Sequence, residues 1–271
     1  MFALGTAESI YWPGTLLSFF ILHFLVFPSS NGYNSYHDKD TSSIGMLKNP
    51  PPVSSKLFYA TLFMDFLAIG LGLWISIWFS LLVFLFILVS RAYSYRPIRL
   101  KRYPIISFLL VALFQGAAVY LSSLMAISNI PDLLFFNYET ATCMAISSLF
   151  IGSIYPLTQI YQHQSDKADG VTTISYKLGY TGTFLFSALL FISATFLVYK
   201  YFSLQNQVKY FQLFVIITLP IIIWFLVWFY KVFKNTSQAN YSNTMYMNLI
   251  TSICMNVFFL FLTLNRYGNW Y

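Results

Sequence analysis

Long apolar runs dominate the sequence and leave few folds open to it. Most of them can cross the ~30 Å hydrocarbon core of a bilayer as helices. The backbone must satisfy its own hydrogen bonds in lipid, so each run is predicted to be helical. Only 8% of the 271 residues are charged, against roughly 25% in a soluble domain. We predict an all-α integral membrane protein with spans near residues 13–30, 56–76, 78–92, 104–125, 140–160, 180–200, 210–230 and 246–265.

The cations divide unequally between the two sides of this bundle. Alternate loops, beginning after the first span, hold all Lys and Arg residues except Lys200, Lys209 and Arg266. Cytoplasmic loops carry the excess of Lys and Arg in membrane proteins. We therefore predict a multi-pass protein of the cell (inner) membrane, with the cation-rich loops in the cytoplasm. The net charge of +7 then reflects topology, and we expect no nucleic-acid partner.

Four of the eight acids fall in two of these cytoplasmic loops. The stretch "NSYHDKD" (residues 34–40) contains Asp38 and Asp40, and "HQSDKADG" (residues 163–170) contains Asp166 and Asp169. Asn34 lies four residues before Asp38, so on a helical end the two share a face, and Asp166 and Asp169 can do the same. Carboxylate and amide oxygens suit Mg²⁺, which is often completed by substrate phosphates.

A third cytoplasmic loop, "RAYSYRPIRLKRYP" (residues 91–104), carries five cations. Arg contacts phosphate in bidentate fashion and Lys acts as a point charge. Two acidic patches, one basic patch and an apolar bundle together favour a diphosphate with a long hydrocarbon tail as ligand. The alternative is that these are solvated loops that only set orientation. Asp38 and Asp166 are predicted to approach within about 15 Å, a span that hydrated ions and a diphosphate can bridge.

Asp65 lies within a predicted span, in "LFYATLFMDFLAIGLG". An ionisable group at this depth usually faces a protein or water-filled interior. Two interpretations stay open: a polar contact in a ligand cavity, or a hydrogen-bonded packing partner. His37 and His163, beside the acidic motifs, are further candidate contacts.

These motifs resemble those of the UbiA-type intramembrane prenyltransferases. "NSYHDKD" is similar to the first aspartate-rich motif, "YSYRPIRLKRYP" to the basic loop, and "SDKADGVTTISYKLG" to the second motif. The resemblance implies a helical bundle, nine helices in the family and about eight here, around a central apolar cavity. It also implies Mg²⁺-dependent transfer of a prenyl group from an isoprenoid diphosphate. Carried over by position, the implied catalytic residues are Asp38 and Asp166, the metal residues Asn34, Asp38, Asp166 and Asp169, and the diphosphate contacts Tyr95, Arg99 and Lys101, with Asp40 and Asp65 as further possibilities.

The sequence departs from the family pattern at several positions. Ser35, Ser42 and Gln162 stand where the family often has Asp, and Arg99 stands where Lys is usual. Fewer carboxylates mean less charge to neutralise a metal, which Asp40 and Asp169 would partly replace. We expect one UbiA-like domain over residues 1–271, whose apolar start, "MFALGTAESIY", resembles the end of an incomplete first helix.

The motifs describe the donor and leave the acceptor open. A small aromatic or quinone-precursor acceptor is the leading hypothesis, and a porphyrin or a lipid is the alternative. A different class of function, an isoprenoid-binding transporter or a catalytically idle relative, also fits the depleted acidic motifs.

Overall fold

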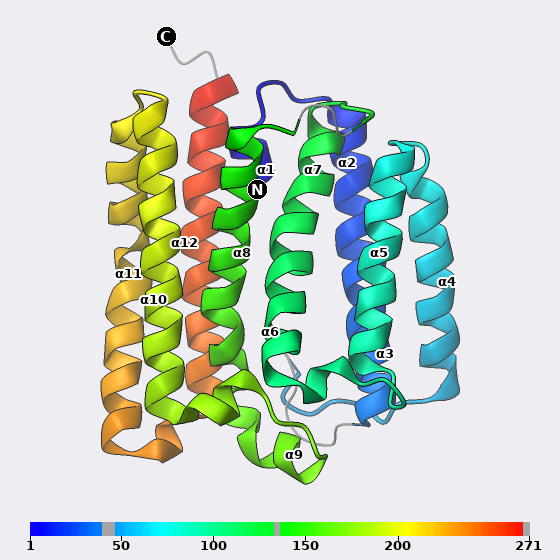
Figure 1. Ribbon diagram of the computed structural model, residues 1–271, viewed down its shortest axis with the longest axis vertical. Helices are drawn as coiled ribbons and strands as arrows, with labels where there is room; N and C mark the ends of the chain where they lie inside the picture. The colour runs from blue at the N-terminus through cyan, green and yellow to red at the C-terminus, as the bar shows by residue number, and fades with distance from the viewer. Residues whose placement is uncertain (40–46, 133–135, 268–271) are drawn as a thin grey trace. The chain divides into compact units, whose positions relative to one another are not determined.

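The computed structural model describes residues 1–39, 47–132 and 136–267. Within them there is no β-strand, and eight helices are long and apolar enough to cross a membrane (Figure 1). The predicted all-α fold with about eight spans is confirmed. The spans are Trp12–Asp38 (α2, η1 and α3), Ser55–Gly72 (α4), Ile77–Ser94 (α5), Pro104–Ile127 (α6, η3 and α7), Tyr138–Ala168 (α8, η4 and α9), Ile174–Leu204 (α10), Val208–Lys234 (α11) and Tyr241–Tyr267 (α12).

The first span extends eight residues beyond its predicted end. After the π-helical segment η1 (Ile21–Val26), α3 (Phe27–Asp38) continues through polar residues and ends only at Lys39, whose φ of 53° is left-handed. The loss of apolar character after residue 30 marks the end of the hydrocarbon region and does not end the helix. The first acidic motif therefore begins on a helix and not in a loop.

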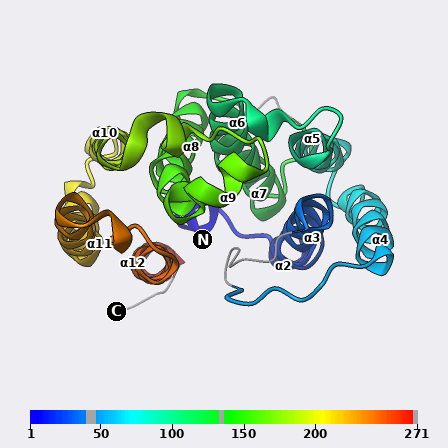
Figure 2. The ribbon, with the colours of Figure 1, turned by 90° about the horizontal axis from the view of Figure 1, so that it is seen from below.

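The chain forms two compact units. Unit 1 comprises residues 1–6, 102–120 and 137–271, and unit 2 comprises residues 7–101 and 121–136. In unit 1, the short α1 (Phe2–Thr6) packs on α12, and α8 (Tyr138–Gln159), α10, α11 and α12 lie side by side (Figure 2). Phe184 and Trp228 are fully buried at the centre of the core of this unit, with ring centroids 4.9 Å apart.

Close helix contact in unit 1 depends on a glycine. A Cβ added at Gly116, in the π-helical segment η3 (Ala112–Ala118), would lie 2.5 Å from the Cα of Ser148 on α8. Small residues at helix interfaces allow this approach in membranes, where packing and not the hydrophobic effect joins helices.

Hydroxyl groups connect the helices of unit 2. The Ser29 hydroxyl of α3 lies 2.9 Å from the Thr61 carbonyl of α4, and Ser80 of α5 donates to the Ile69 carbonyl of α4 at 2.8 Å. By contrast, Phe66 and Trp74 are 75% and 78% exposed. Such outward aromatic surface is expected where a helix faces lipid and its interfaces.

Candidate active site

The last turns of α3 carry the first acidic motif. Asn34 and Asp38 are one helical turn apart; Asn34 contacts the last residue of α5, and Asp38 contacts the segment that follows α5. The Asn34 side-chain oxygen accepts a hydrogen bond from Ser94 at 2.8 Å. The Asp38 side chain is only 7% exposed and is ion-paired with Lys101. The two side chains that could supply oxygen ligands to a metal therefore lie on one face of the helix, as the spacing predicted.

The basic segment after α5 folds as tight turns over this end of α3. Tyr95 ends α5 as its cap, and its carbonyl accepts hydrogen bonds from the amides of Ile98 and Arg99. Arg99 has a left-handed φ of 45° and leads into the one-turn 3₁₀ helix η2 (Leu100–Arg102). These turns place the guanidinium of Arg99 3.5 Å from Asp38 and bring the Lys101 ammonium onto the same carboxylate oxygen.

The cations around the C-terminal end of α3 compensate the negative charge that gathers there. A helix C-terminus carries a partial negative charge, to which Asp38 adds its own. Arg96 donates to the His37 carbonyl at 2.8 Å, and Arg99 and Lys101 contact the carboxylate. Arg99 and Lys101 are each only 9% exposed. A buried carboxylate with two buried cations leaves a net positive charge, which suits an anion.

Tyr95 lies beside this cluster. It is 42% exposed, and its ring meets the His37 ring edge-on at a centroid distance of 5.7 Å. Tyr95 is therefore the more exposed neighbour of the buried Arg99 and Lys101.

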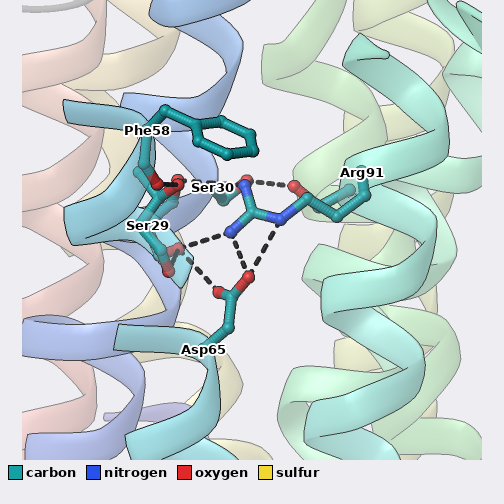
Figure 3. A network of polar contacts seen from close by, with 7 residues as sticks. Ser29, Ser30, Phe58, Asp65 and Arg91 are labelled. Carbon is teal, nitrogen blue, oxygen red and sulfur yellow. Dashed lines mark hydrogen bonds and ion pairs between the residues drawn. The ribbon is translucent and has the colours of Figure 1, made fainter. Parts of the chain in front are cut away.

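Asp65 belongs to a separate network at membrane depth. Arg91 reaches from α5 to Asp65 on α4 and to Ser29 on α3 (Figure 3). Ser29 donates to Asp65 at 2.6 Å and accepts from Arg91 at 2.7 Å, and the Arg91 guanidinium lies 4.0 Å from the centre of the Tyr33 ring. Asp65 is thus hydrogen-bonded and ion-paired within unit 2, where it ties α3 to α4 and α5. Its role as a polar contact of a ligand cavity stays a prediction.

The second acidic motif lies on a short helix in unit 1. Asp166 is in α9 (His163–Ala168), and Asp169 is the residue that caps it. The chain then reverses through Gly170, whose φ of 70° suits a residue without Cβ. The Val171 amide donates to the Asp166 carbonyl at 2.8 Å, closing the turn. Both carboxylates are partly exposed at this end of the unit.

A buried hydrogen-bond chain fixes α9 against α10. His163 Nε2 is 2.8 Å from the Ser175 hydroxyl, which is 3.0 Å from the Thr183 hydroxyl. The His163 ring also stacks on Tyr180 with centroids 5.0 Å apart. His163 is therefore held inside the unit, where it fixes α9 against α10, and its role as a ligand contact stays a prediction.

The structure brings some predicted site residues together and leaves others apart. Asn34, Asp38, Tyr95, Arg99 and Lys101 gather in unit 2, whereas Asp166 and Asp169 lie in unit 1. The approach of Asp38 to Asp166 stays a prediction. Asp40 lies outside the described residues. Among those described, no three His, Cys, Asp or Glu side chains cluster as a metal site.

Sequence reasoning missed the roles of Arg91, Ser29 and Ser94. Arg91 was counted among the five cations of the basic loop, although it falls inside the predicted span 78–92. A signal was present: an acid within a span needs a partner, and Arg91 is a cation within a neighbouring span. For Ser94, which orients Asn34, no comparable signal exists.

A model of the UbiA prenyltransferase family matches residues 1–251. The chain belongs to the UbiA prenyltransferase family. The predicted family and enzyme class, a membrane-embedded prenyltransferase, are thereby confirmed. No curated protein matches the sequence.

Solved UbiA structures share the fold of this family member. One is a UbiA homologue from Archaeoglobus fulgidus bound to DMAPP and Mg²⁺, with a TM-score of 0.68 and 15% identity over 99% of this chain and 92% of the other. Another structure of an Archaeoglobus fulgidus homologue, bound to Cd²⁺, has a TM-score of 0.67 and 14% identity over 96% and 90%. A structure of digeranylgeranylglyceryl phosphate synthase has a TM-score of 0.62 and 18% identity over 98% and 90%.

Proposed function

We propose that this prenyltransferase transfers the prenyl group of an isoprenoid diphosphate to a small, lipophilic or aromatic acceptor in the bilayer, in a Mg²⁺-dependent reaction. Residues 1–271 would act as one catalytic domain, with one acidic motif from each unit. The active-site loops would face the cytoplasm of the cell (inner) membrane, in accord with the distribution of Lys and Arg.

The observation that carries this proposal is the buried cluster of Asp38 with Arg99 and Lys101 at the end of a membrane-spanning helix. It joins a carboxylate that suits a metal to two cations that suit a diphosphate. An amphiphilic donor needs both groups at the boundary where its head leaves the hydrocarbon. The homologue bound to DMAPP and Mg²⁺ supports the same ligand pair.

The donor set fits Mg²⁺ better than a softer metal. Asp38 and Asn34 offer oxygen ligands on one helix face, and Asp166 and Asp169 offer two further carboxylates. Such a small set suits Mg²⁺, which keeps several waters and takes phosphate oxygens as ligands. Bound there, Mg²⁺ would neutralise charge on the departing diphosphate.

The residues of the chain would promote the reaction by charge and by exclusion of water. The allylic C–O bond breaks, its electron pair leaves with the diphosphate, and an acceptor atom bonds to the prenyl carbon and loses a proton. Arg99 and Lys101 would hold the diphosphate. They would stabilise its negative charge more in the transition state, where that charge grows, than in the bound substrate, and this difference is the source of catalysis. The exposed face of Tyr95 would stabilise positive charge on the allyl group by about 0.5–2 kcal/mol.

A transfer assay with variant enzymes tests the proposal. Purified protein is given radiolabelled isoprenoid diphosphates, Mg²⁺ and a pool of aromatic, quinone-precursor, porphyrin and lipid acceptors. We expect Mg²⁺-dependent transfer that falls at least about a hundredfold in Asp38→Asn and Asp166→Asn, since each 1.36 kcal/mol of lost stabilisation costs about tenfold. Asp132→Asn, the same change at an acid outside both motifs, should keep its rate. Equal rates in all three variants would refute the site.

A further inference from the structure

Unit 1 contains an apolar cavity whose lining includes no residue of either acidic motif. A cavity of about 540 Å³ lies between α8, α10, α11 and α12, within the usual size range of ligand pockets. Its floor includes Leu157 of α8 and Met247 of α12, which are 2% and 4% exposed. Among the residues that the structure describes, no ionisable side chain other than the Tyr199 phenol lines it.

The cavity opens sideways between α10 and α11. The two helices are in contact on either side of the opening: Tyr199 packs on Phe211 at 5.2 Å, and Phe184 packs on Phe225 at 5.4 Å. Between these contacts Ile192, on α10, is 64% exposed. In Figure 2, α10 and α11 lie on one side of this four-helix group and α8 and α12 on the other. Because the opening lies within membrane-spanning segments, molecules of the bilayer reach the cavity through it.

Two lysines mark one end of this opening. Lys200 lies one residue after Tyr199, and its ammonium is 5.7 Å from the centre of the Phe196 ring, which lines the cavity. Lys209 is in the first turn of α11, two residues before Phe211. Both are exposed, and neither is paired with a carboxylate in the part of the chain that the structure describes.

Lys209, whose ammonium lies 5.1 Å from the centre of the Tyr210 ring, does not stabilise α11 through the helix macrodipole. A cation in the first turn opposes the helix macrodipole, which favours anions there. The residue before α11, Gln207, makes no capping hydrogen bond with its side chain. An anion at this position would meet both the ammonium group and the amides of a helix N-terminus.

We propose that this cavity binds an anionic phospholipid, with one acyl chain between α10 and α11 and the phosphate held by Lys200 and Lys209. Lys200 and Lys209 lie at the ends of α10 and α11 that are remote from α9, so the lipid belongs to the leaflet opposite α9. It fills the space that the four helices leave open and links α10 to α11 at their connected ends.

Photo-crosslinking tests the assignment. The full chain is placed in phosphatidylcholine nanodiscs with a trace of phosphatidylglycerol that bears a diazirine in one acyl chain, and labelled peptides are mapped. We expect labelling in the four segments that line the cavity, within residues 150–157, 187–199, 211–226 and 247–255. Unlabelled phosphatidylglycerol should compete about 25-fold better than phosphatidylcholine, because each lysine near a membrane surface contributes about fivefold in affinity for an anionic lipid.

Matched variants separate the parts of the site. Lys200→Gln/Lys209→Gln should abolish the preference for phosphatidylglycerol, whereas Lys231→Gln/Lys234→Gln, an equal charge change at the other end of α11, should retain it. Ala188→Trp, which fills the cavity, should prevent labelling by the probe. Leu189→Trp, on the outer face of α10, should not.

Four results would overturn the proposal. Three of them are equal competition by the two phospholipids, labelling outside the four segments that line the cavity, and an unchanged preference in the lysine double variant, which decides the matter even if Ala188→Trp fails to fold. Stronger competition by farnesyl diphosphate than by phosphatidylglycerol would assign the cavity to an isoprenoid chain and would also overturn it.

Discussion

Lys101→Met should change the affinities for metal and for diphosphate in opposite directions. Asp38 is buried and in contact with both Lys101 and Arg99. Mg²⁺ added alone must therefore compete with two cations for one carboxylate. A diphosphate draws these cations to itself and frees the carboxylate for the metal. The two ligands should bind cooperatively, and by linkage each should improve the affinity for the other by the same factor.

The magnitude follows from the ion-pair geometry. Two unit charges at 3.5 Å, the distance between Arg99 and Asp38, attract by about 5 kcal/mol at an effective dielectric constant near 20. Most of this is offset by the cost of removing the charges from water. We expect the loss of the Lys101 charge to strengthen binding of Mg²⁺ alone about tenfold, or about 1.4 kcal/mol, and to weaken pyrophosphate binding by at least as much.

Isothermal titration calorimetry of the purified protein measures both effects. Mg²⁺ is titrated with and without pyrophosphate into wild type and Lys101→Met, which keeps the apolar stem of the side chain. Lys56→Met is the control, because Lys56 is exposed at the start of α4 and the charge change is the same. An affinity for Mg²⁺ alone that is unchanged, or that rises equally in the control, would refute the reasoning.

Three further predictions concern the framework of the site. Arg91→Met leaves Asp65 buried without its cation and should destabilise the protein by about 3–5 kcal/mol, seen as a lower Tm in detergent, with much of the loss recovered in Asp65→Leu/Arg91→Met; equal Tm values in wild type and the single variant would contradict this. Gly170→Val should lower the free energy of unfolding by about 1–2 kcal/mol and reduce transfer, because a φ of 70° disfavours a side chain although no neighbour lies near the added Cβ. Gly170→Asn should be tolerated. Equal losses in the two variants would point to a steric cause. Gly116→Ala should lower the Tm because its Cβ would meet the α8 backbone, whereas Gly70→Ala, with open space, should not; equal Tm values would show that the close approach is dispensable.

The sequence predicts the helices of this protein well because lipid restricts the backbone. A segment that crosses hydrocarbon must be both apolar and helical, so the apolar runs locate all eight candidate spans. Helix ends are less predictable, because hydropathy reports depth in the membrane and not helical conformation. The first membrane span shows this, since its helix continues through polar residues to Asp38.

The sequence indicates the residue types of the candidate site but not the contacts among them. Acidic and basic clusters indicated a metal–diphosphate ligand, and the resemblance gave the residues their roles. Neither indicated that Asp38 pairs directly with Lys101, because that contact depends on the left-handed turn at Arg99. The pairing of Asp65 with Arg91 likewise follows from how α4 packs on α5.

The central claim is that Asp38 and Asp166 share one metal–diphosphate site. Cryo-electron microscopy of the protein with Mg²⁺ and a non-hydrolysable thiolo-diphosphate analogue of the donor tests it most directly. We predict metal density between the two motifs and carboxylates within about 15 Å of each other, a span that hydrated ions and a diphosphate can bridge. Carboxylates more than about 25 Å apart, too far for any such bridge, or metal density remote from Asp38, would contradict the account.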